Sequence, residues 1–371
     1  MRLLPHILIL IIVLAFTSTF AQTTAEQYLT RANESFKQKE YDGAIADYSR
    51  AIALDPKTVD AYRNRGLARE AKKNYAGAVL DFNKLVDFDP NIAESYYLRG
   101  HAKMMIGDND GAVVDLSKTI ELDPRHIRAF YSRGVIRGFR LDSAGEMADY
   151  ASAIEIDPNF AEVFYTRAVA RKLKGDSRGA IADYTELIRI DPQDRLAYHY
   201  RASERVKVKD YDGAIADFTK EIGFDPANAL AYGERASLYS LKKNYSAAIA
   251  DYTRIIELDP KSTFAYYSRA EARKLNGDLN GAYSDLTLYI KERPGLDMLV
   301  ELGDLRYLMK DFDGAIAFFN AAIELSSRSP ALYRKRAAAY TGLNDLKRAK
   351  DDNKKAVELE KNVKTIFRTF P

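Results

Sequence analysis

Arginine and aspartate side chains recur at regular intervals along this sequence of 371 residues, and their spacing is the first sign of chemistry. Eight evenly spaced arginines begin with Arg31, Arg65 and Arg99, and an aspartate follows each of them at one fixed distance. A ninth pair, Arg336 and Asp352, has the same separation. A guanidinium and a carboxylate can form a charge-assisted, bidentate hydrogen bond. The alternative is that the arginines form a basic stripe that binds an acidic ligand.

One place in the pattern loses both partners together. Where the period would put Arg and Asp, the sequence has Leu302 and Phe318. A joint loss favours a structural pair, because a buried charge left without its partner is costly whereas two apolar replacements are not. We therefore predict structural ion pairs, among them Arg133 with Asp149 and Arg167 with Asp183.

Catalytic and metal-binding chemistry finds little support in the sequence. There is no cysteine, which excludes a disulfide, a thiol nucleophile and a thiolate metal site. Neither a paired-histidine motif nor a glycine-rich phosphate loop is present. The four histidines are scattered: His6, His101, His126 and His199. We predict a protein that is not an enzyme and that needs no metal or cofactor.

Prolines give the clearest view of the elements that must position these side chains. They are evenly spaced, and a fixed period of about 20–50 residues is the signature of an array of stacked, similar units. Each proline follows a helical pattern and ends it, because the residue before proline is disfavoured in the helical conformation. The eight prolines in one register are Pro56, Pro90, Pro124, Pro158, Pro192, Pro226, Pro260 and Pro294.

Numbering each proline as position 32 gives ten repeats, of which the eighth is one residue short. Two amphipathic helices flank a turn at position 15, so positions 7 and 23 are equidistant from the turn and should face each other. Gly or Ala at position 8 and Ala at position 20 let the two helices approach closely. Glu146 is the exception at position 20, and we expect it to splay or re-register its hairpin.

The aromatic residues at positions 4 and 24, the small residues at 8 and 20 and the proline at 32 resemble the tetratricopeptide repeat over residues 25–363. Arg at position 7 departs from the Leu usual in that family. The resemblance implies an all-α fold, an α-solenoid of antiparallel helix pairs stacked in a right-handed superhelix. It also implies that the first helices line a concave groove that binds peptides or protein partners.

By the same resemblance, positions 2, 5, 9, 12 and 13 of each repeat face the groove. Tyr and Met side chains exposed together are typical of adaptable peptide-binding surfaces. The alternative is that these residues pack between neighbouring repeats. The predicted groove residues in repeats three to five are Tyr97, His101, Met104, Met105, Tyr131, Val135, Phe139, Tyr165 and Val169.

Residues 1–21 lie outside the repeats. Arg2 precedes ten apolar residues, 7–16, and a small residue follows at Ala21, a pattern typical of a secretory signal cleaved after Ala21. The alternative is a membrane anchor, but ten apolar residues are too few to span a hydrocarbon core of about 30 Å. We expect an exported protein, periplasmic or secreted, with no membrane span in the mature chain.

The expected domains are thus a signal peptide (1–21), an array of ten repeats (22–363) and a C-terminal capping segment (364–371), whose apolar residues are spaced as on one face of a helix. The net charge of +3 gives no electrostatic footprint for nucleic acid or an anionic membrane. We predict a scaffold or adaptor that binds a peptide or partner protein in its groove. The alternative is a glycan-binding accessory of cell-envelope machinery, although such a surface would be expected to carry Trp, and the sequence has none.

Overall fold

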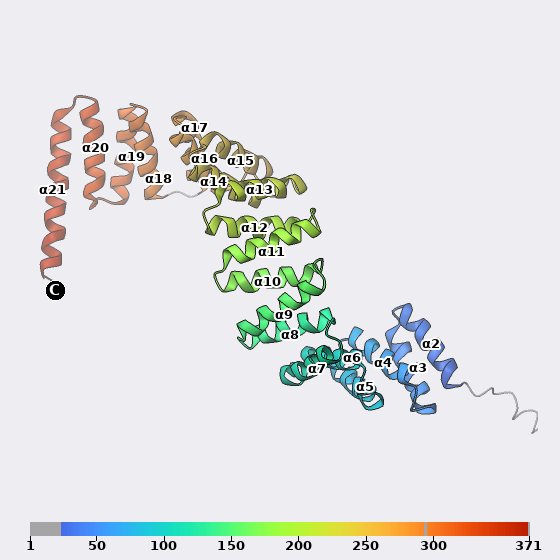
Figure 1. Cartoon of the computed structure of the whole chain (residues 1–371). Helices are drawn as coiled ribbons and strands as arrows, with labels where there is room; N and C mark the ends of the chain where they lie inside the picture. Colours follow the sequence, from blue (N-terminus) through green and yellow to red (C-terminus); the bar gives the residue numbers. More distant parts are fainter. Residues whose placement is uncertain (1–23, 293–294, 370–371) are drawn as a thin grey trace, which may run out of the picture. The chain divides into compact units, whose positions relative to one another are not determined.

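The structure is a computed structural model that describes residues 24–292 and 295–369 (Figure 1). Over these residues the chain forms helices joined by short turns, and the predicted all-α solenoid fold is confirmed. The chain divides into two compact parts, an N-terminal part that ends at Lys174 and a C-terminal part that begins at Gly175. The expected signal peptide, 1–21, lies outside the described residues.

The N-terminal part consists of four antiparallel helix pairs followed by one further helix. Each pair packs against the next along the chain. The helices are α2 (Ala25–Lys37) with α3 (Tyr41–Leu54), α4 (Val59–Ala71) with α5 (Tyr75–Phe88), α6 (Ala93–Met105) with α7 (Asn109–Leu122), α8 (Ile127–Phe139) with α9 (Ser143–Ile156), and then α10 (Ala161–Leu173).

The C-terminal part begins with one helix and continues with five pairs. Its pairs follow the same antiparallel plan. The helices are α11 (Ser177–Ile190), then α12 (Arg195–Lys207) with α13 (Tyr211–Phe224), α14 (Ala229–Leu241) with α15 (Tyr245–Leu258), α16 (Thr263–Leu275) with α17 (Leu279–Glu292), α18 (Leu296–Leu308) with α19 (Phe312–Leu325), and α20 (Pro330–Gly342) with α21 (Leu346–Thr369).

Helix boundaries follow the register of the repeats. The first helix of each repeat begins at position 1, and the residue at position 15 has a φ between 60° and 86° in every repeat. That left-handed residue ends the first helix and turns the chain. The next side chain then caps the second helix in most repeats: Asp142, for example, accepts a hydrogen bond from the backbone N–H of Gly145 at 3.0 Å.

In many of the hairpins the core lies where a ring at position 24 meets the small residue at position 8. A Cβ atom added to Gly134 would lie 2.7 Å from the Tyr150 ring, and one added to Gly66 would clash with the Phe82 ring. Both rings are fully buried. Close helix approach therefore depends on the small residues that the sequence repeats.

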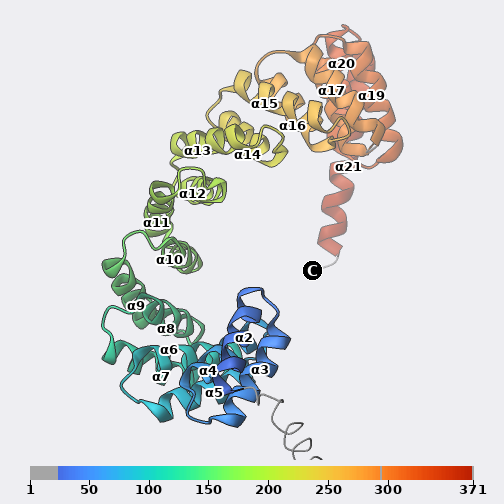
Figure 2. The same cartoon turned by 90° about the vertical axis from the view of Figure 1, so that its right-hand side faces the viewer.

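The expected C-terminal capping segment, 364–371, lies partly within the described residues. Residues 364–369 continue α21, which Figure 2 shows as one long helix. The side chains of residues 362–371 lie outside the described ones, so capping of the array by this segment stays a prediction. Within the described residues, no helix combines the length and apolar character needed to cross a bilayer.

Candidate partner-binding site

The Arg133–Asp149 ion pair lies inside the α8–α9 hairpin. Arg133 donates from Nε to Asp149 Oδ2 at 3.0 Å and from Nη2 to Oδ1 at 2.8 Å. Arg137 Nη1 donates to the same carboxylate at 2.9 Å, and the remaining Arg133 nitrogen, Nη1, donates to Ser117 Oγ of the preceding repeat at 3.0 Å. Asp149 is buried, so these guanidinium groups hold the repeats together and are not presented to a ligand.

The same arrangement recurs along the chain. In each case the guanidinium Cζ also lies between 5.1 Å and 5.7 Å from the centroid of the ring at position 4, a favourable cation–π distance. The predicted pair of Arg167 and Asp183 joins residues of the two parts and stays a prediction. The pairs observed are Arg31–Asp47, Arg65–Asp81, Arg99–Asp115, Arg133–Asp149, Arg201–Asp217, Arg235–Asp251, Arg269–Asp285 and Arg336–Asp352.

Repeat nine, α18 and α19, replaces the ion pair with apolar packing. Leu302 is buried in one cluster with Leu305, and Phe318 packs against that cluster. Arg306 occupies the position that Arg137 has in repeat four. It pairs with Asp311, with Nη1 2.8 Å from Oδ2, and its Cζ lies 3.9 Å from the centroid of the Tyr283 ring. In repeat nine the two residues of the ion pair are therefore replaced by apolar ones, and the remaining arginine has another partner.

Repeat four, α8 and α9, breaks the pattern in a different way, at Glu146. The Glu146 side chain is buried, and its Oε2 accepts a hydrogen bond from Lys174 Nζ at 2.5 Å. A Cβ atom on Gly138 would lie 2.6 Å from Glu146 Oε1, so the glycine makes the room that the glutamate occupies. The expectation that Glu146 splays or re-registers its hairpin is wrong, because Arg133 and Asp149 keep their usual geometry.

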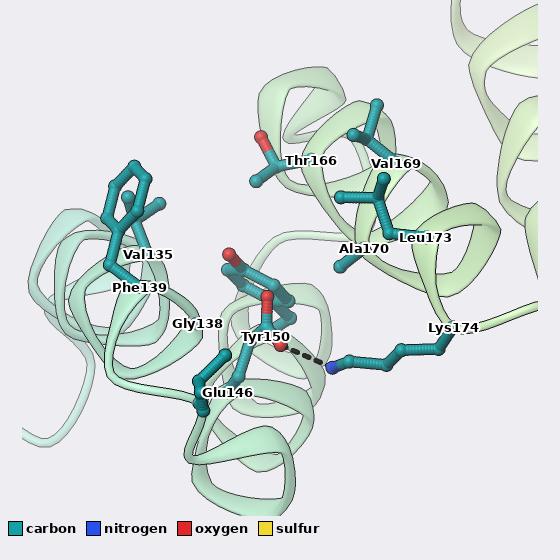
Figure 3. Close-up of a pocket in the computed structure, with 11 residues that line it drawn as sticks. Val135, Gly138, Phe139, Glu146, Tyr150, Thr166, Val169, Ala170, Leu173 and Lys174 are labelled. Carbon is teal, nitrogen blue, oxygen red and sulfur yellow. Dashed lines mark hydrogen bonds and ion pairs between the residues drawn. The ribbon is translucent and has the colours of Figure 1, made fainter.

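A cavity of about 390 Å³ lies between the α8–α9 hairpin and α10. Figure 3 shows Val135 and Phe139 on one side, Val169 and Leu173 on the other, and Tyr150 between them. The walls are mostly apolar, and the ion pair of Glu146 and Lys174 runs along one edge. The residues that line it are Val135, Gly138, Phe139, Leu141, Glu146, Tyr150, Thr166, Val169, Ala170, Leu173 and Lys174.

Three large apolar side chains at this cavity are open to solvent. Phe139 is 79% exposed, Leu141 89% and Leu173 82%. Leu141 also has a φ of 63°, a left-handed conformation that costs a residue with a Cβ about 1–2 kcal/mol. Every other repeat has Lys, Gly or Asn at that turn position. The left-handed conformation is common to all ten turns, so what distinguishes Leu141 is its exposed apolar side chain.

The cavity brings together three of the predicted groove residues, Val135, Phe139 and Val169. Tyr131 lies beside it, since its hydroxyl is 3.1 Å from Thr166 Oγ1 in the cavity wall. Tyr165 is 43% exposed but does not line the cavity.

The predicted groove residues of repeat three are mostly occupied by their neighbours. The Tyr97 ring centroid lies 4.5 Å from that of His126, and burial raises the pKa of Tyr97. His101 Nδ1 is 3.1 Å from Glu70 Oε1, and Met104 packs against a buried cluster. Met105 alone is exposed. Tyr97 and Met104 therefore fit the alternative interpretation, in which these residues pack between repeats.

Leu141, Leu173 and the ion pair of Glu146 with Lys174 were not among the residues that the sequence predicted for the site. A signal was present for two of them. Leu173 occupies position 13, as Phe139 does, and Leu141 is the only apolar residue at position 15. No sequence signal joins Glu146 to Lys174, which are 28 residues apart.

The titratable side chains that line the cavity are Glu146, Tyr150 and Lys174. Over residues 24–292 and 295–369, no three His, Asp or Glu side chains gather in a way that would hold a metal ion. Burial is the main cause that raises the pKa of Tyr150, and the charge of Glu146 adds to it, so the phenol stays protonated. The arrangement offers apolar surface and one ion pair, which suits binding rather than proton transfer.

Comparison with protein families gives two matches, both to the same kind of repeat. A model described as "TPR repeat" matches residues 32–73, and one described as "Tetratricopeptide repeat" matches residues 93–126, 161–194, 229–262 and 296–328. Among curated proteins, serine/threonine-protein phosphatase 5 of Homo sapiens is 50% identical over 44 residues. Those residues are 12% of this chain and 9% of the phosphatase, so the chain spans under a tenth of that relative's length.

Solved structures with a similar fold are also repeat proteins. The C-terminal part of a TPR repeat-containing protein from Cytophaga hutchinsonii is 16% identical, covers 65% of this chain and 98% of its own, and has a TM-score of 0.57. A tetratricopeptide repeat protein from Parabacteroides merdae is 16% identical, covers 68% of this chain and 98% of its own, and has a TM-score of 0.46. At these identities the likeness concerns the fold alone.

Proposed function

Because this chain is a tetratricopeptide repeat protein, we propose that it is a non-enzymatic scaffold that holds a peptide or partner protein in the cavity between α8, α9 and α10. One observation carries the proposal: Phe139, Leu141 and Leu173, each more than three-quarters exposed, gather around a cavity of about 390 Å³. Contiguous exposed apolar surface is a cost that soluble proteins avoid unless a partner covers it.

The cavity's chemistry indicates what part of a partner enters it. Its volume lies within the range of small-ligand pockets, about 300–1,000 Å³, and is large enough for one or two apolar side chains. The walls offer Val135 and Val169 for van der Waals contact, and the ion pair of Glu146 with Lys174 forms a charged edge. A peptide whose apolar anchor enters the cavity while its backbone stays near that edge satisfies both features.

Export to the periplasm or the medium is part of the same proposal. It is supported by the order of charged, apolar and small residues over 1–21. Mass spectrometry of the protein purified from its source tests it: an N-terminus at Gln22 is expected, and an intact Met1 in a cell-associated protein would contradict it.

Binding at the cavity can be tested with a random dodecapeptide library displayed on phage. Peptides selected on the wild-type chain are expected to lose at least about tenfold in affinity for a Phe139→Ser, Leu173→Ser variant, because truncating a central anchor typically costs over about 1 kcal/mol. Both side chains are exposed, so the fold should survive the change.

The matched control is a Leu80→Ser, Val114→Ser variant, which removes two other exposed apolar side chains from the N-terminal part, 66% and 68% exposed. Selected peptides should bind this control as they bind the wild type. Equal binding to all three proteins would show that the peptides do not bind at this cavity. A soluble polysaccharide that binds the wild type and the control but not the cavity variant would replace the peptide by a glycan.

A further inference from the structure

Repeat seven, in the C-terminal part, lacks a pair of rings that repeats three and four have. In repeat three the rings of Tyr97 at position 5 and His126 at position 34 have centroids 4.5 Å apart. In repeat four Tyr131 and Phe160, at the same positions, are 5.6 Å apart, edge to face. In repeat seven these positions hold Gly233 and Ser262.

The space that the two rings would fill is open. A cavity of about 260 Å³, the Gly233 pocket, lies beside α14. A Cβ atom on Gly233 would be in ordinary contact, 3.7 Å, with Ile255 Cδ1 and Phe264 Cε1, and the volume beyond it is empty. The residues that line the pocket are Ala229, Leu230, Gly233, Glu234, Ser237, Ile255, Ser262 and Phe264.

The walls of the Gly233 pocket are suited to an aromatic ring. Phe264 is 56% exposed and Leu230 62% exposed, so both present apolar surface to solvent. The ring of Tyr252 meets that of Phe264 edge to face at 6.1 Å and holds it in place. Aromatic rings prefer such edge-to-face and offset arrangements, and the Phe264 ring offers one to an incoming ring.

The charge at the rim is negative. The exposed Glu234 carboxylate forms no hydrogen bond or ion pair with the described residues. Its charge acts on His199, but that ring takes Glu221 as its hydrogen-bond partner. A carboxylate without a bonded cation, beside an apolar pocket, complements a basic group on a ligand, and such rim charges act on association through the local field.

We propose that the Gly233 pocket binds the aromatic side chain of a peptide in which that residue is flanked by Lys or Arg. The ligand's ring takes the place that the chain's own aromatic residues take at positions 5 and 34 in repeats three and four, and its basic neighbour pairs with Glu234. This site belongs to the C-terminal part and stands independently of the cavity between α8, α9 and α10.

Three capped tripeptides test the proposal against the full chain, with NMR signals of the Leu230 and Ile255 methyl groups as the readout. Acetyl-Arg-Phe-Arg-amide is expected to shift these signals and to bind at least about tenfold more tightly than acetyl-Arg-Ala-Arg-amide, because the ring is the buried anchor. Acetyl-Glu-Phe-Glu-amide should bind more weakly than the Arg peptide, by a factor that shrinks as salt is added.

Variants at one position separate the pocket from the fold. Gly233→Tyr restores the residue that repeats three, four, five and eight carry and is expected to fill the pocket and abolish binding of the Arg-Phe-Arg peptide. Gly233→Ala adds a Cβ without a clash and should keep that binding. If Gly233→Tyr does not fold, as judged by circular dichroism, the exposed Leu230→Ser variant gives the same test with a weaker expected loss.

Equal binding of the Phe and Ala peptides, or full binding by folded Gly233→Tyr, would overturn the proposal. The Phe139→Ser, Leu173→Ser variant should bind these peptides as the wild type does. Binding at the Gly233 pocket and binding at the cavity between α8, α9 and α10 are therefore tested by different variants, so that one proposal can fail without the other.

Discussion

Repeats four and nine each break the pattern of the array, and the two breaks have different consequences. Repeat nine changes two facing residues together, to Leu302 and Phe318, and both become part of an apolar cluster. Repeat four changes Ala to Glu146 and makes room for it with Gly138, but the glutamate finds its cation, Lys174, beyond its own hairpin, at the end of α10. A cavity lies at that junction.

The difference lies in what compensates the change. In repeat nine the compensation is apolar and aromatic: Leu302 and Phe318 join a cluster that includes residues of repeat eight, and Arg306 lies over Tyr283 of that repeat. In repeat four the compensation is a charge from the next repeat, Lys174, and an apolar cavity lies at that face, where in an array each repeat packs on its neighbour. Candidate binding sites in this protein thus arise from deviations at the faces between repeats, and not from the residues that define the repeat.

The largest effect is expected from breaking the ion pair of repeat four on one side only. Arg133→Leu should lower the free energy of unfolding by about 3–5 kcal/mol, because Asp149 stays buried with an incomplete set of donors. Arg133→Leu with Asp149→Phe, which copies repeat nine, should recover most of that loss. Urea unfolding of the single variants and the double variant measures the coupling, and no coupling would show that the pair is not a structural unit.

Adding Val113→Tyr to the Arg133→Leu, Asp149→Phe variant should raise its free energy of unfolding. In repeat nine the second arginine, Arg306, lies over the ring of Tyr283, and Val113 occupies the equivalent position before repeat four. The tyrosine would give Arg137 the ring that it lacks once Asp149 is removed. A triple variant less stable than the double variant would contradict this account of how repeat nine tolerates its loss.

A smaller effect is expected at Gly138. Gly138→Ala places a Cβ 2.6 Å from Glu146 Oε1 and should cost about 1–3 kcal/mol by overpacking. Glu146→Ala in the same chain, which restores the residue usual at position 20, should reverse that cost. If Gly138→Ala is neutral in thermal unfolding, with Glu146 still present, the two residues do not share the space as the structure indicates.

A gain in stability is expected at the turn of repeat four. Leu141→Gly should raise the free energy of unfolding by about 0.5–1 kcal/mol, since glycine adopts a positive φ without the strain that a Cβ brings. The same change should weaken binding of peptides selected on the cavity. Lys243→Gly, at the same turn position of repeat seven, is the control: it should stabilise the chain comparably and leave that binding unchanged.

The smallest effect concerns repeat six, where Glu221 is buried and His199 Nδ1 lies 3.0 Å from its Oε2. The hydrogen bond to Glu221 raises the pKa of His199 above its usual 6.5. The imidazolium therefore contributes stability that is fully present below about pH 6.5 and is lost as the pH rises through the folded-state pKa. Urea unfolding at pH 6 and pH 8.5 should show the loss, and His199→Gln should remove it; an unchanged pH dependence in that variant would assign it to other groups.

Several features of the molecule could be predicted from the sequence because they are local and repeated. The period set by residues such as Pro124 and Pro158 predicted the helix boundaries, since each unit folds by contacts within itself and with its neighbours. The equal distance of Arg133 and Asp149 from a turn at Leu141 predicted their pairing, because two antiparallel helices bring such positions together.

Only the tertiary structure decided which deviations open a site. In the sequence, Glu146 indicates a disturbance of its own hairpin; in the structure, Gly138 accommodates it and Lys174 neutralises it from the end of α10. Likewise Gly233 and Ser262 are ordinary small residues until their shared space is seen to be empty. Whether a gap is filled depends on the side chains that neighbouring repeats contribute to the same volume. Their combined volume is decided by three-dimensional packing.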